Sequence, residues 1–285
     1  MDWLTSKRTL NVDRTLVMAI LNVTPDSFSD GGKFIGLDAA LRRTEKYVAE
    51  GADILDVGGE STRPGGGKVA ADEERRRVIP VIEAVSKRFD IPISVDTWKS
   101  EVAAAAAGAG AEIVNDISGF RFDERMPAVA AAHRTGLVLM HLKGTFETMH
   151  EKDPGAEILG EVAGGFRWSL EKALEYGIER NRIAFDIGIG FGKTFAQNLE
   201  LIANLDKIAA EFAGFPLLVG TSRKSFIGKI LADAPADRRL AGSLASAAVS
   251  AWNGAGILRV HDVRETVEML KVVEALKEEK KNNEK

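Results

Sequence analysis

The sequence repeats one pattern eight times: a short apolar run ends in polar or charged residues, and a helix-like stretch follows. Short apolar runs are typical of strands buried on both faces, and apolar positions spaced by three or four residues are typical of helices. Strands that alternate with helices form parallel sheets, and eight such units favour a closed barrel over an open sheet. We therefore predict an α/β fold, namely a single (β/α)8 TIM barrel.

The length of 285 residues suits one such barrel of roughly 250 residues without a second core. We assign residues 1–276 to a single domain, in which residues 1–15 are expected to form a short lead-in, a hairpin that closes the bottom of the barrel. Residues 277–285 are almost all charged or amide, and we expect them to be a disordered charged tail. Among the helices, the spacing predicts one over residues 37–50, one over 121–134 and one over 198–212.

Composition narrows the possible functions. The formal net charge of -4 argues against a nucleic-acid partner, because such binding needs a basic surface. The chain has no cysteine, which excludes disulfides, thiolate catalysis and zinc–thiolate sites. No apolar run is long enough to span a membrane, and the first residues lack the apolar core of a signal peptide. We therefore expect a cytoplasmic protein without a membrane or nucleic-acid partner.

The polar residues that end the apolar runs are the candidate functional groups. In a parallel barrel, every strand directs its carboxyl end to the same face, so residues far apart in sequence meet at one mouth. We predict that this mouth gathers Asn22, Asp56, Arg63, Asp96, Asn115, His141, Asp186, Lys224, Arg259 and His261.

One strand end favours an anion in particular. Residues 217–219 are apolar, Gly220 follows, and the next five residues supply three hydroxyls with Arg223 and Lys224 before a helical pattern begins. A helix N-terminus offers free N–H groups and a positive dipole end, and the two cations add charge. The alternative is an ordinary capped helix with solvated basic residues.

A second stretch resembles a nucleotide-binding loop and fails the test. Residues 188–194 read GIGFGKT, but the Walker pattern needs glycine where Ile187 stands. The dinucleotide pattern needs a third glycine where Lys193 stands. Neither motif is therefore present, and nucleotide binding through them is disfavoured.

The candidate residues divide into two chemical groups. Asn22, Ser61, Thr62, Arg63, Arg259 and His261 are donors or ligands suited to a diphosphate, alone or with Mg²⁺. Asp96, Asn115, Asp186 and Lys224 suit a flat heterocycle, because a carboxylate accepts two hydrogen bonds from an amine and a ring N–H while a lysine donates to a carbonyl. Together they predict a substrate that is a ring bearing a diphosphate.

Seven motifs now carry a family resemblance, which extends along almost the whole chain. The chain resembles the bacterial dihydropteroate synthases, which are pterin-binding TIM barrels. The motifs are ILNVTPDSFSDGG (20–32), GGESTRPG (58–65), SVDT (94–97), NDISG (115–119), GIGFGK (188–193), SRKS (222–225) and RVHDV (259–263).

The resemblance implies a transferase of folate biosynthesis that joins 7,8-dihydropterin-6-ylmethyl diphosphate to 4-aminobenzoate with Mg²⁺ and releases diphosphate. It also implies a homodimer. Carried over by motif, the catalytic residues would be Asp96, Lys224, Arg259 and His261. The pterin would lie against Asp96, Asn115, Met140, Asp186, Phe191 and Lys224; the diphosphate against Thr62, Arg63, Arg259 and His261; 4-aminobenzoate against Phe28, Pro64 and Ser225; and the metal on Asn22.

Two positions depart from the family pattern, because Ile187 and Phe146 stand where prolines are usual. Two alternative functions also stay open at this point. One is a pterin-binding methyltransferase acting with a corrinoid protein, which would not need the predicted diphosphate group of Arg63, Arg259 and His261. The other is a pterin-binding barrel without catalysis, which would release no diphosphate.

Overall fold

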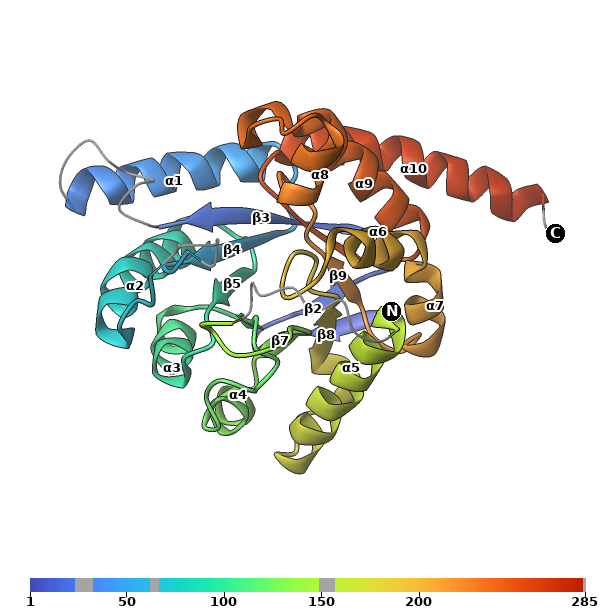
Figure 1. Ribbon diagram of the computed structural model, residues 1–285. Coiled ribbons are helices and arrows are strands. Elements are labelled where there is room, and N and C mark those ends of the chain that lie inside the picture. Colours follow the sequence, from blue (N-terminus) through green and yellow to red (C-terminus); the bar gives the residue numbers. More distant parts are fainter. Residues whose placement is uncertain (24–32, 62–66, 149–156, 284–285) are drawn as a thin grey trace.

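Eight parallel strands close into a barrel, as the repeated pattern predicts (Figure 1). The computed structural model describes residues 1–23, 33–61, 67–148 and 157–283. Around the barrel the strand order is β10-β3-β4-β5-β6-β7-β8-β9. The strands are β3 (Leu16–Asn22), β4 (Ile54–Gly58), β5 (Ile93–Asp96), β6 (Ile113–Asp116), β7 (Gly136–Met140), β8 (Ile183–Asp186), β9 (Leu217–Val219) and β10 (Ile257–Val260).

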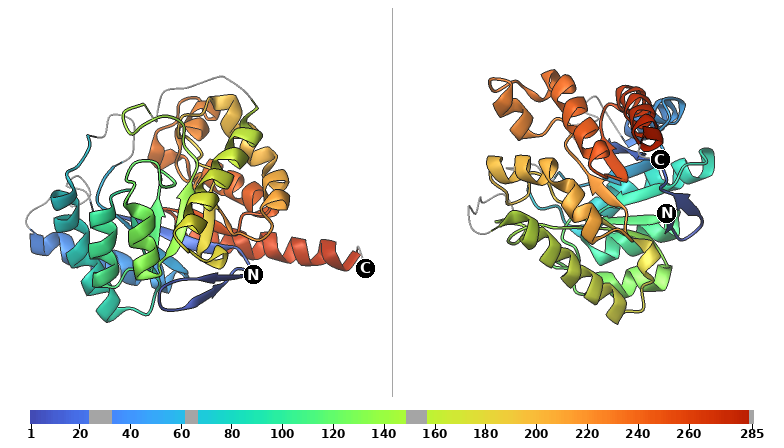
Figure 2. Two further views of the ribbon diagram at one scale, coloured as in Figure 1. Left: turned by 90° about the horizontal axis from the view of Figure 1, so that it is seen from below. Right: turned by 90° about the vertical axis from the view of Figure 1, so that its right-hand side faces the viewer.

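Helices surround the barrel and bury its outer face, because each carries one apolar side (Figures 1 and 2). Aromatic rings fill part of this layer: Phe166 stacks on Phe185 with centroids 4.5 Å apart, and Phe212 meets both edge-on. The helices are α1 (Lys33–Ala49), α2 (Ala71–Arg88), α3 (Ser100–Ala109), α4 (Met126–His133), α5 (Ile158–Glu175), α6 (Phe195–Ala203), α7 (Leu205–Glu211), α8 (Ser225–Ile230), α9 (Leu240–Trp252) and α10 (Val263–Asn283).

The lead-in forms the expected hairpin. β1 (Asp2–Leu4) pairs antiparallel with β2 (Thr9–Asn11). Trp3 is fully buried from this hairpin and packs with apolar residues that begin the barrel strands, among them Met18, Ile54 and Ile113. Its indole N–H donates to the carbonyl of Arg182 at 2.9 Å. The hairpin therefore closes the end of the barrel opposite the carboxyl ends of the strands.

Two helix predictions are wrong in extent. The helix predicted over residues 121–134 begins only at Met126, because the carboxylate of Asp116 accepts the amides of Ser118 and Phe120 and holds the preceding segment in turns. The helix predicted over residues 198–212 is two helices, α6 and α7, which meet at Asn204. The side-chain amide of Asn204 donates to the carbonyl of Glu200 at 2.9 Å and helps to end α6 there.

The prediction of a disordered tail is wrong for residues 277–283, which continue α10. Their lysines and glutamates are good helix formers, so an established helix propagates into them at little cost. Lys277 also donates to the carbonyl of Ala251 on α9, and the ammonium of Lys280 lies 5.6 Å from the ring centroid of Trp252. These contacts dock the charged end of the helix.

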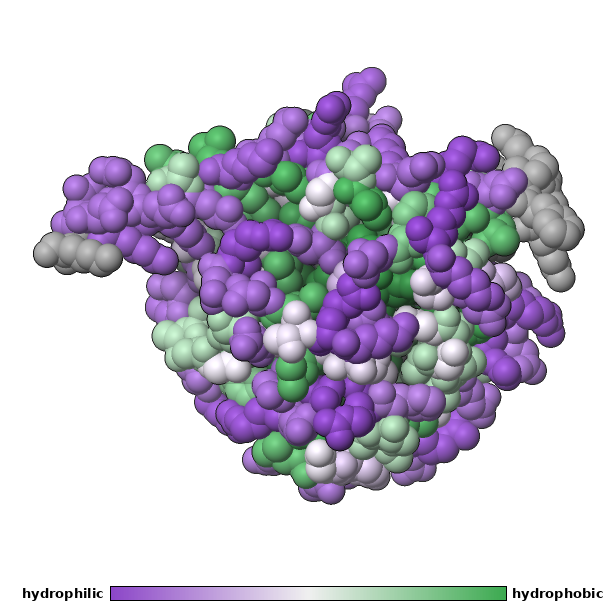
Figure 3. All heavy atoms as spheres, turned by 180° about the vertical axis from the view of Figure 1, so that it is seen from behind, coloured by the Kyte–Doolittle hydropathy of each residue, from purple (hydrophilic) through white to green (hydrophobic). Residues whose placement is uncertain are grey.

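Hydrophilic residues cover most of the surface seen from behind, with apolar residues interspersed between them (Figure 3). None of the helices in the described ranges is both long and apolar enough to cross a bilayer.

Candidate active site

The register of the barrel brings the predicted polar residues into one layer. Asn22 pairs with Gly58, Gly58 with Asp96, and Asp96 with Asn115, so three polar side chains from β3, β5 and β6 stand at the same level. On the opposite wall, Asp186 ends β8 beside Met140. The predicted convergence of strand ends at one mouth is therefore confirmed for these residues.

Arg259 of β10 lies at the centre of this layer. Its Nε donates to Oδ2 of Asp56 and one Nη donates to Oδ2 of Asp96, both at 2.6 Å. The side-chain amide of Asn115 donates to the same Asp56 oxygen at 3.2 Å. The guanidinium thus links β10 to β4 and β5, the second and third strands after it around the barrel.

Because these side chains are buried, the pKa of each one depends on the charge of its neighbours. It works against the charge of Arg259, but Asp56 and Asp96 outweigh that effect and raise the pKa of the guanidinium. Burial also raises the pKa of Asp96 to about 7; Arg259 opposes this rise and Asp56 adds to it. Asp96 therefore titrates near neutral pH while Arg259 stays charged.

A second charged pair lies across the mouth. Burial raises the pKa of Asp186, against the attraction of Lys224, and lowers the pKa of Lys224 to about 8, against the attraction of Asp186. Oδ1 of Asp186 accepts the amide of Gly188 at 2.7 Å. The ammonium of Lys224 donates to the carbonyl of Ile189 and lies 4.8 Å from the ring centroid of Phe191.

Apolar side chains form the floor beside this pair. Met140 is buried in a cluster with Trp98, Ile117 and Leu142, and Phe191 packs against that cluster. A carboxylate, an ammonium and an aromatic ring next to an apolar floor form a surface suited to a flat, polar-edged ring.

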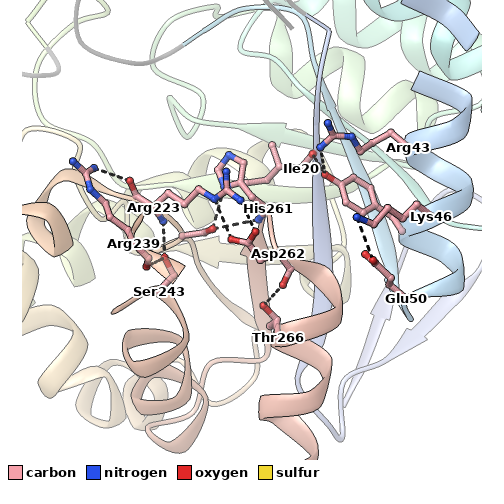
Figure 4. A network of polar contacts seen from close by, with 12 residues as sticks. Ile20, Arg43, Lys46, Glu50, Arg223, Arg239, Ser243, His261, Asp262 and Thr266 are labelled. Atoms are coloured by element: carbon pink, nitrogen blue, oxygen red, sulfur yellow. Dashed lines mark hydrogen bonds and ion pairs between the residues drawn. The ribbon is translucent and has the colours of Figure 1, made fainter. Parts of the chain in front are cut away.

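His261 lies on the β10 side of the mouth, where the loop after β9 supports it. Its Nδ1 lies 3.0 Å from the hydroxyl of Ser222. The next residue, Asp262, forms an ion pair with Arg223, whose amide donates to the hydroxyl of Ser243 at 2.9 Å and whose carbonyl accepts from Arg239 (Figure 4). These contacts hold Arg223 at a φ of 59°, a left-handed conformation that is unusual for a residue with a side chain.

The turn held in this way presents Lys224 and Ser225 in sequence. Lys224 caps α8, and Ser225 is its first residue. The strand-to-helix step predicted from residues 217–229 is therefore confirmed, while the binding of an anion to it stays a prediction.

Asn22 and Asp96 are suitably placed for a cation that takes few protein ligands. Their side-chain oxygens lie 3.6 and 3.5 Å from the point where a side chain on Gly58 would begin. Within the described residues no group of three or more acidic or histidine side chains could hold a metal alone. Mg²⁺ nevertheless fits this arrangement, since it commonly takes one or two protein oxygens and completes its shell with water and phosphate.

Some predicted residues fall outside this geometry. Phe28, Thr62, Arg63 and Pro64 lie outside the described residues. His141 follows β7, but its buried imidazole lies against Gly165 of α5 rather than beside Arg259. The prediction that its side chain joins the others is wrong, because successive strand residues point to opposite faces and Met140 takes the inner one.

The sequence does not predict the contacts of two residues at the site. Asp56 is expected at the rim, but its bonds to Arg259 and Asn115 are not predicted. Ser222 is expected as a hydroxyl near an anion, but its contact with His261 is not predicted. A carboxylate inside the apolar run of β4 was the available signal for Asp56, because a buried charge needs a partner.

Comparisons with known proteins show the family of this chain. The family model of pterin binding enzymes matches residues 18–261. A dihydropteroate synthase of Escherichia coli is 47% identical over 277 residues, which are 96% of this chain and 95% of that protein.

Solved structures give the same result. A Xanthomonas albilineans dihydropteroate synthase with 4-aminobenzoic acid is 42% identical with a TM-score of 0.88, covering 95% of this chain and 96% of its own. A Clostridium difficile dihydropteroate synthase, solved in the presence of pteroic acid, is also 42% identical with a TM-score of 0.87, covering 93% and 97%. The chain belongs to the dihydropteroate synthases, within the family of pterin binding enzymes.

Proposed function

We propose that this protein joins 7,8-dihydropterin-6-ylmethyl diphosphate to 4-aminobenzoate, giving 7,8-dihydropteroate and diphosphate. The observation that carries the proposal is the meeting of two groups of polar side chains at one rim. Asp186 and Lys224 form a site for a polar ring, and Arg259 stands across from them between Asp56 and Asp96. A ring that carries a diphosphate matches both groups at once.

The pterin would bind on the Asp186 side. Its amino group and adjacent ring N–H would donate to the Asp186 carboxylate, and Lys224 would donate to the ring carbonyl. Asn115 and Asp96 would contact the far edge of the ring, and Met140 and Phe191 would lie against its faces. Because the polar groups of this site are buried, each hydrogen bond that a ligand leaves unmatched is costly, which favours a pterin over a plain aromatic ring.

The diphosphate would bind on the Arg259 side, with His261 and with Thr62 and Arg63. Asn22 would hold Mg²⁺ together with oxygens of the diphosphate, since its amide oxygen faces the same space as Asp96. When bound, the metal would supply positive charge that stabilises the leaving diphosphate. 4-Aminobenzoate would bind near Ser225, with Phe28 and Pro64.

The reaction then needs no protein nucleophile. The bond between the exocyclic methylene and the diphosphate oxygen breaks, and its electron pair leaves with diphosphate. Arg259 and His261 stabilise that negative charge, while ionised Asp96 stabilises the positive charge that spreads over the pterin ring. The nitrogen of 4-aminobenzoate attacks the methylene and then loses a proton.

A diphosphate-release assay tests this function. Purified protein with Mg²⁺ and both substrates should release diphosphate and form 7,8-dihydropteroate in equal amounts, as followed by a coupled phosphate assay and chromatography. Omitting 4-aminobenzoate should remove the pteroate product. Absence of pteroate with both substrates present would refute the proposal. The remaining candidate functions would then be a non-catalytic pterin-binding barrel and a methyltransferase.

We further infer a cytoplasmic homodimer. Exposed apolar side chains on α9 and α10, namely Val249, Trp252, Val272 and Leu276, support an association through these helices. Sedimentation should give twice the mass of the chain, and Trp252→Asp should shift it toward the monomer. A wild-type monomer at micromolar concentration would contradict the inference.

A further inference from the structure

Lys193 lies in the stretch that resembles a nucleotide-binding loop, but its contacts are with the backbone. Lys193 is only 3% exposed, and its ammonium donates to three carbonyl oxygens: those of His141 at 3.1 Å, Gly188 at 2.9 Å and Phe191 at 3.1 Å. An ammonium has three hydrogens, so these bonds use all of its donors. Lys193 is therefore fully occupied by backbone and is not available to a phosphate.

The three carbonyls belong to the two loops that border the Asp186 pocket. His141 follows β7, while Gly188 and Phe191 lie in the turn after β8. Gly188 has a φ of +66°, and a Cβ on it would lie 1.9 Å from the carbonyl oxygen of His141. The two loops thus approach as closely as glycine permits, and Lys193 joins them at that point.

Other bonds hold the opposite side of the same turn. The amide of Gly190 donates to the side chain of Asn198 at 2.6 Å, and the carbonyl of Ile189 accepts from Lys224. Phe191, between these bonds and Lys193, carries the ring that lies beneath the ammonium of Lys224. Removal of Lys193 would take one hydrogen-bond donor from each of its three carbonyl partners, on one side of the turn only, so the turn would shift rather than unfold.

Lys193 also acts on Asp186 through its charge. Burial lowers the pKa of Lys193 to about 7, against the attraction of Asp186. Burial raises the pKa of Asp186, while Lys224, the Gly188 amide, Lys193 and Arg259 oppose that rise. Below neutral pH, a charged Lys193 therefore favours the ionised form of Asp186.

We propose that Lys193 is a positioning residue for the pterin pocket: it fixes the turn after β8 to the end of β7, and so sets the places of Phe191 and Asp186. The inference rests on the proposed function for its substrate. It assigns Lys193 no contact with either substrate.

Lys193→Met tests this role, because methionine keeps the length of the side chain and removes both its donors and its charge. The KM for the pterin diphosphate should rise about tenfold, equivalent to about 1.4 kcal/mol. The KM for 4-aminobenzoate should stay within about twofold, because the turn around Ser225 is held by other bonds. Lys207→Met, an exposed lysine on α7, is the matched control and should change neither constant.

The pH dependence separates positioning from general damage. As the pH falls, Lys193→Met should lose pterin affinity at a higher pH than the wild type does. The reason is that Asp186 in the variant lacks one of the positive charges that keep it ionised. The other charged groups facing the pocket are Lys224, Arg259 and Asp96, and Lys143 and Glu161 face Lys193 itself. These remain in both proteins, so they do not account for a difference between them.

Gly188→Ala gives an independent test that leaves the charge of Lys193 in place. Its Cβ would push the turn away from His141, so the pterin KM should rise although the ammonium of Lys193 is kept. Hydrogen exchange of the segment 187–192 should accelerate in Lys193→Met and not in Lys207→Met.

The outcomes are separable. Unchanged pterin KM and unchanged exchange in folded Lys193→Met would overturn the inference, and so would an equal rise of both KM values. If Lys193→Met fails to fold, the pterin KM of Gly188→Ala decides instead: a value like that of the wild type would overturn it. Wild-type protein that makes no pteroate would refute the proposed function, while the exchange experiment would still test the link between the two loops.

Discussion

At the scale of single residues, Arg259 connects two buried carboxylates of the site. It donates to Asp56 and Asp96 within a buried layer, so its guanidinium is held in place before any substrate arrives. A preorganised donor to developing negative charge is worth about 3 kcal/mol. The pairing therefore prepares Arg259 to meet a leaving diphosphate without reorganisation.

Arg259→Ala should lower turnover by about two orders of magnitude, because about 3 kcal/mol of transition-state stabilisation is lost. Steady-state kinetics of diphosphate release measures the change, with circular dichroism to verify folding. Arg42→Ala, a change at an exposed arginine on α1, is a suitable comparison and should cost much less. Wild-type turnover in Arg259→Ala would contradict the assigned role.

Asp96 predicts a pH dependence near neutrality. Burial raises its pKa to about 7, so it is protonated below that pH and ionised above it. Because the ionised form stabilises the positively charged ring, kcat/KM for the pterin diphosphate should fall as the pH drops through about 7. Asp96→Asn should have low activity without this limb. A wild-type profile that stays flat from pH 8 to about 5.5 would contradict the prediction.

The sequence predicts which residues reach the mouth better than it predicts their partners. The positions of Asp96, Asn115, Asp186 and Arg259 at strand ends follow from the spacing of apolar runs. The pairing of Arg259 with Asp56 does not, because it depends on the closure of β10 against β3 and on the exact height of each side chain. His141 shows the same limit. A shift of one residue along a strand decides which face a side chain takes, and the ring of His141 lies against α5.

At the scale of elements, the helices show where local pattern competes with local hydrogen bonding. The spacing of apolar residues in 121–134 is helical. However, the carboxylate of Asp116 accepts the amides of Ser118 and Phe120, just before this range, and α4 begins only at Met126. The end of α10 shows the opposite effect, because contacts with α9 keep helical a segment whose composition alone suggests disorder. Strands are easier to predict from the sequence, since their apolar runs are short and end abruptly.

The hairpin β1–β2 should contribute stability rather than activity. Trp3 is its fully buried anchor, and Trp3→Ala would leave a large cavity among the residues that begin the barrel strands. The free energy of unfolding should fall by about 3–5 kcal/mol. Urea denaturation measures the loss, and kcat of the folded variant should match the wild type. A loss below about 1 kcal/mol would show that the barrel does not depend on this anchor.

At the scale of the whole molecule, barrel closure places all of the described site residues on one rim and the hairpin at the other end. The pairing of β10 with β3 joins the last strand of the chain to the first one of the barrel. This arrangement separates the parts that bind substrate from the parts that hold the closed end together.

Truncation after Leu276 tests how far the docked end of α10 supports the molecule. It removes Lys277 and Lys280 with their contacts to α9, worth about 1 kcal/mol. The melting temperature should fall by about 2–4 °C for a chain of this size. Turnover should be unchanged. Strong loss of turnover would mean that this segment acts on the mouth.

The course of α10 has a practical use as well. The helix carries the chain away from the barrel body, and its last described turns lie on the side of the hairpin (Figure 2). A fluorophore, an affinity peptide or a linker to a solid support attached behind α10 would therefore leave the entrance for substrates open. Such a handle would allow immobilised protein to be titrated with each substrate in turn.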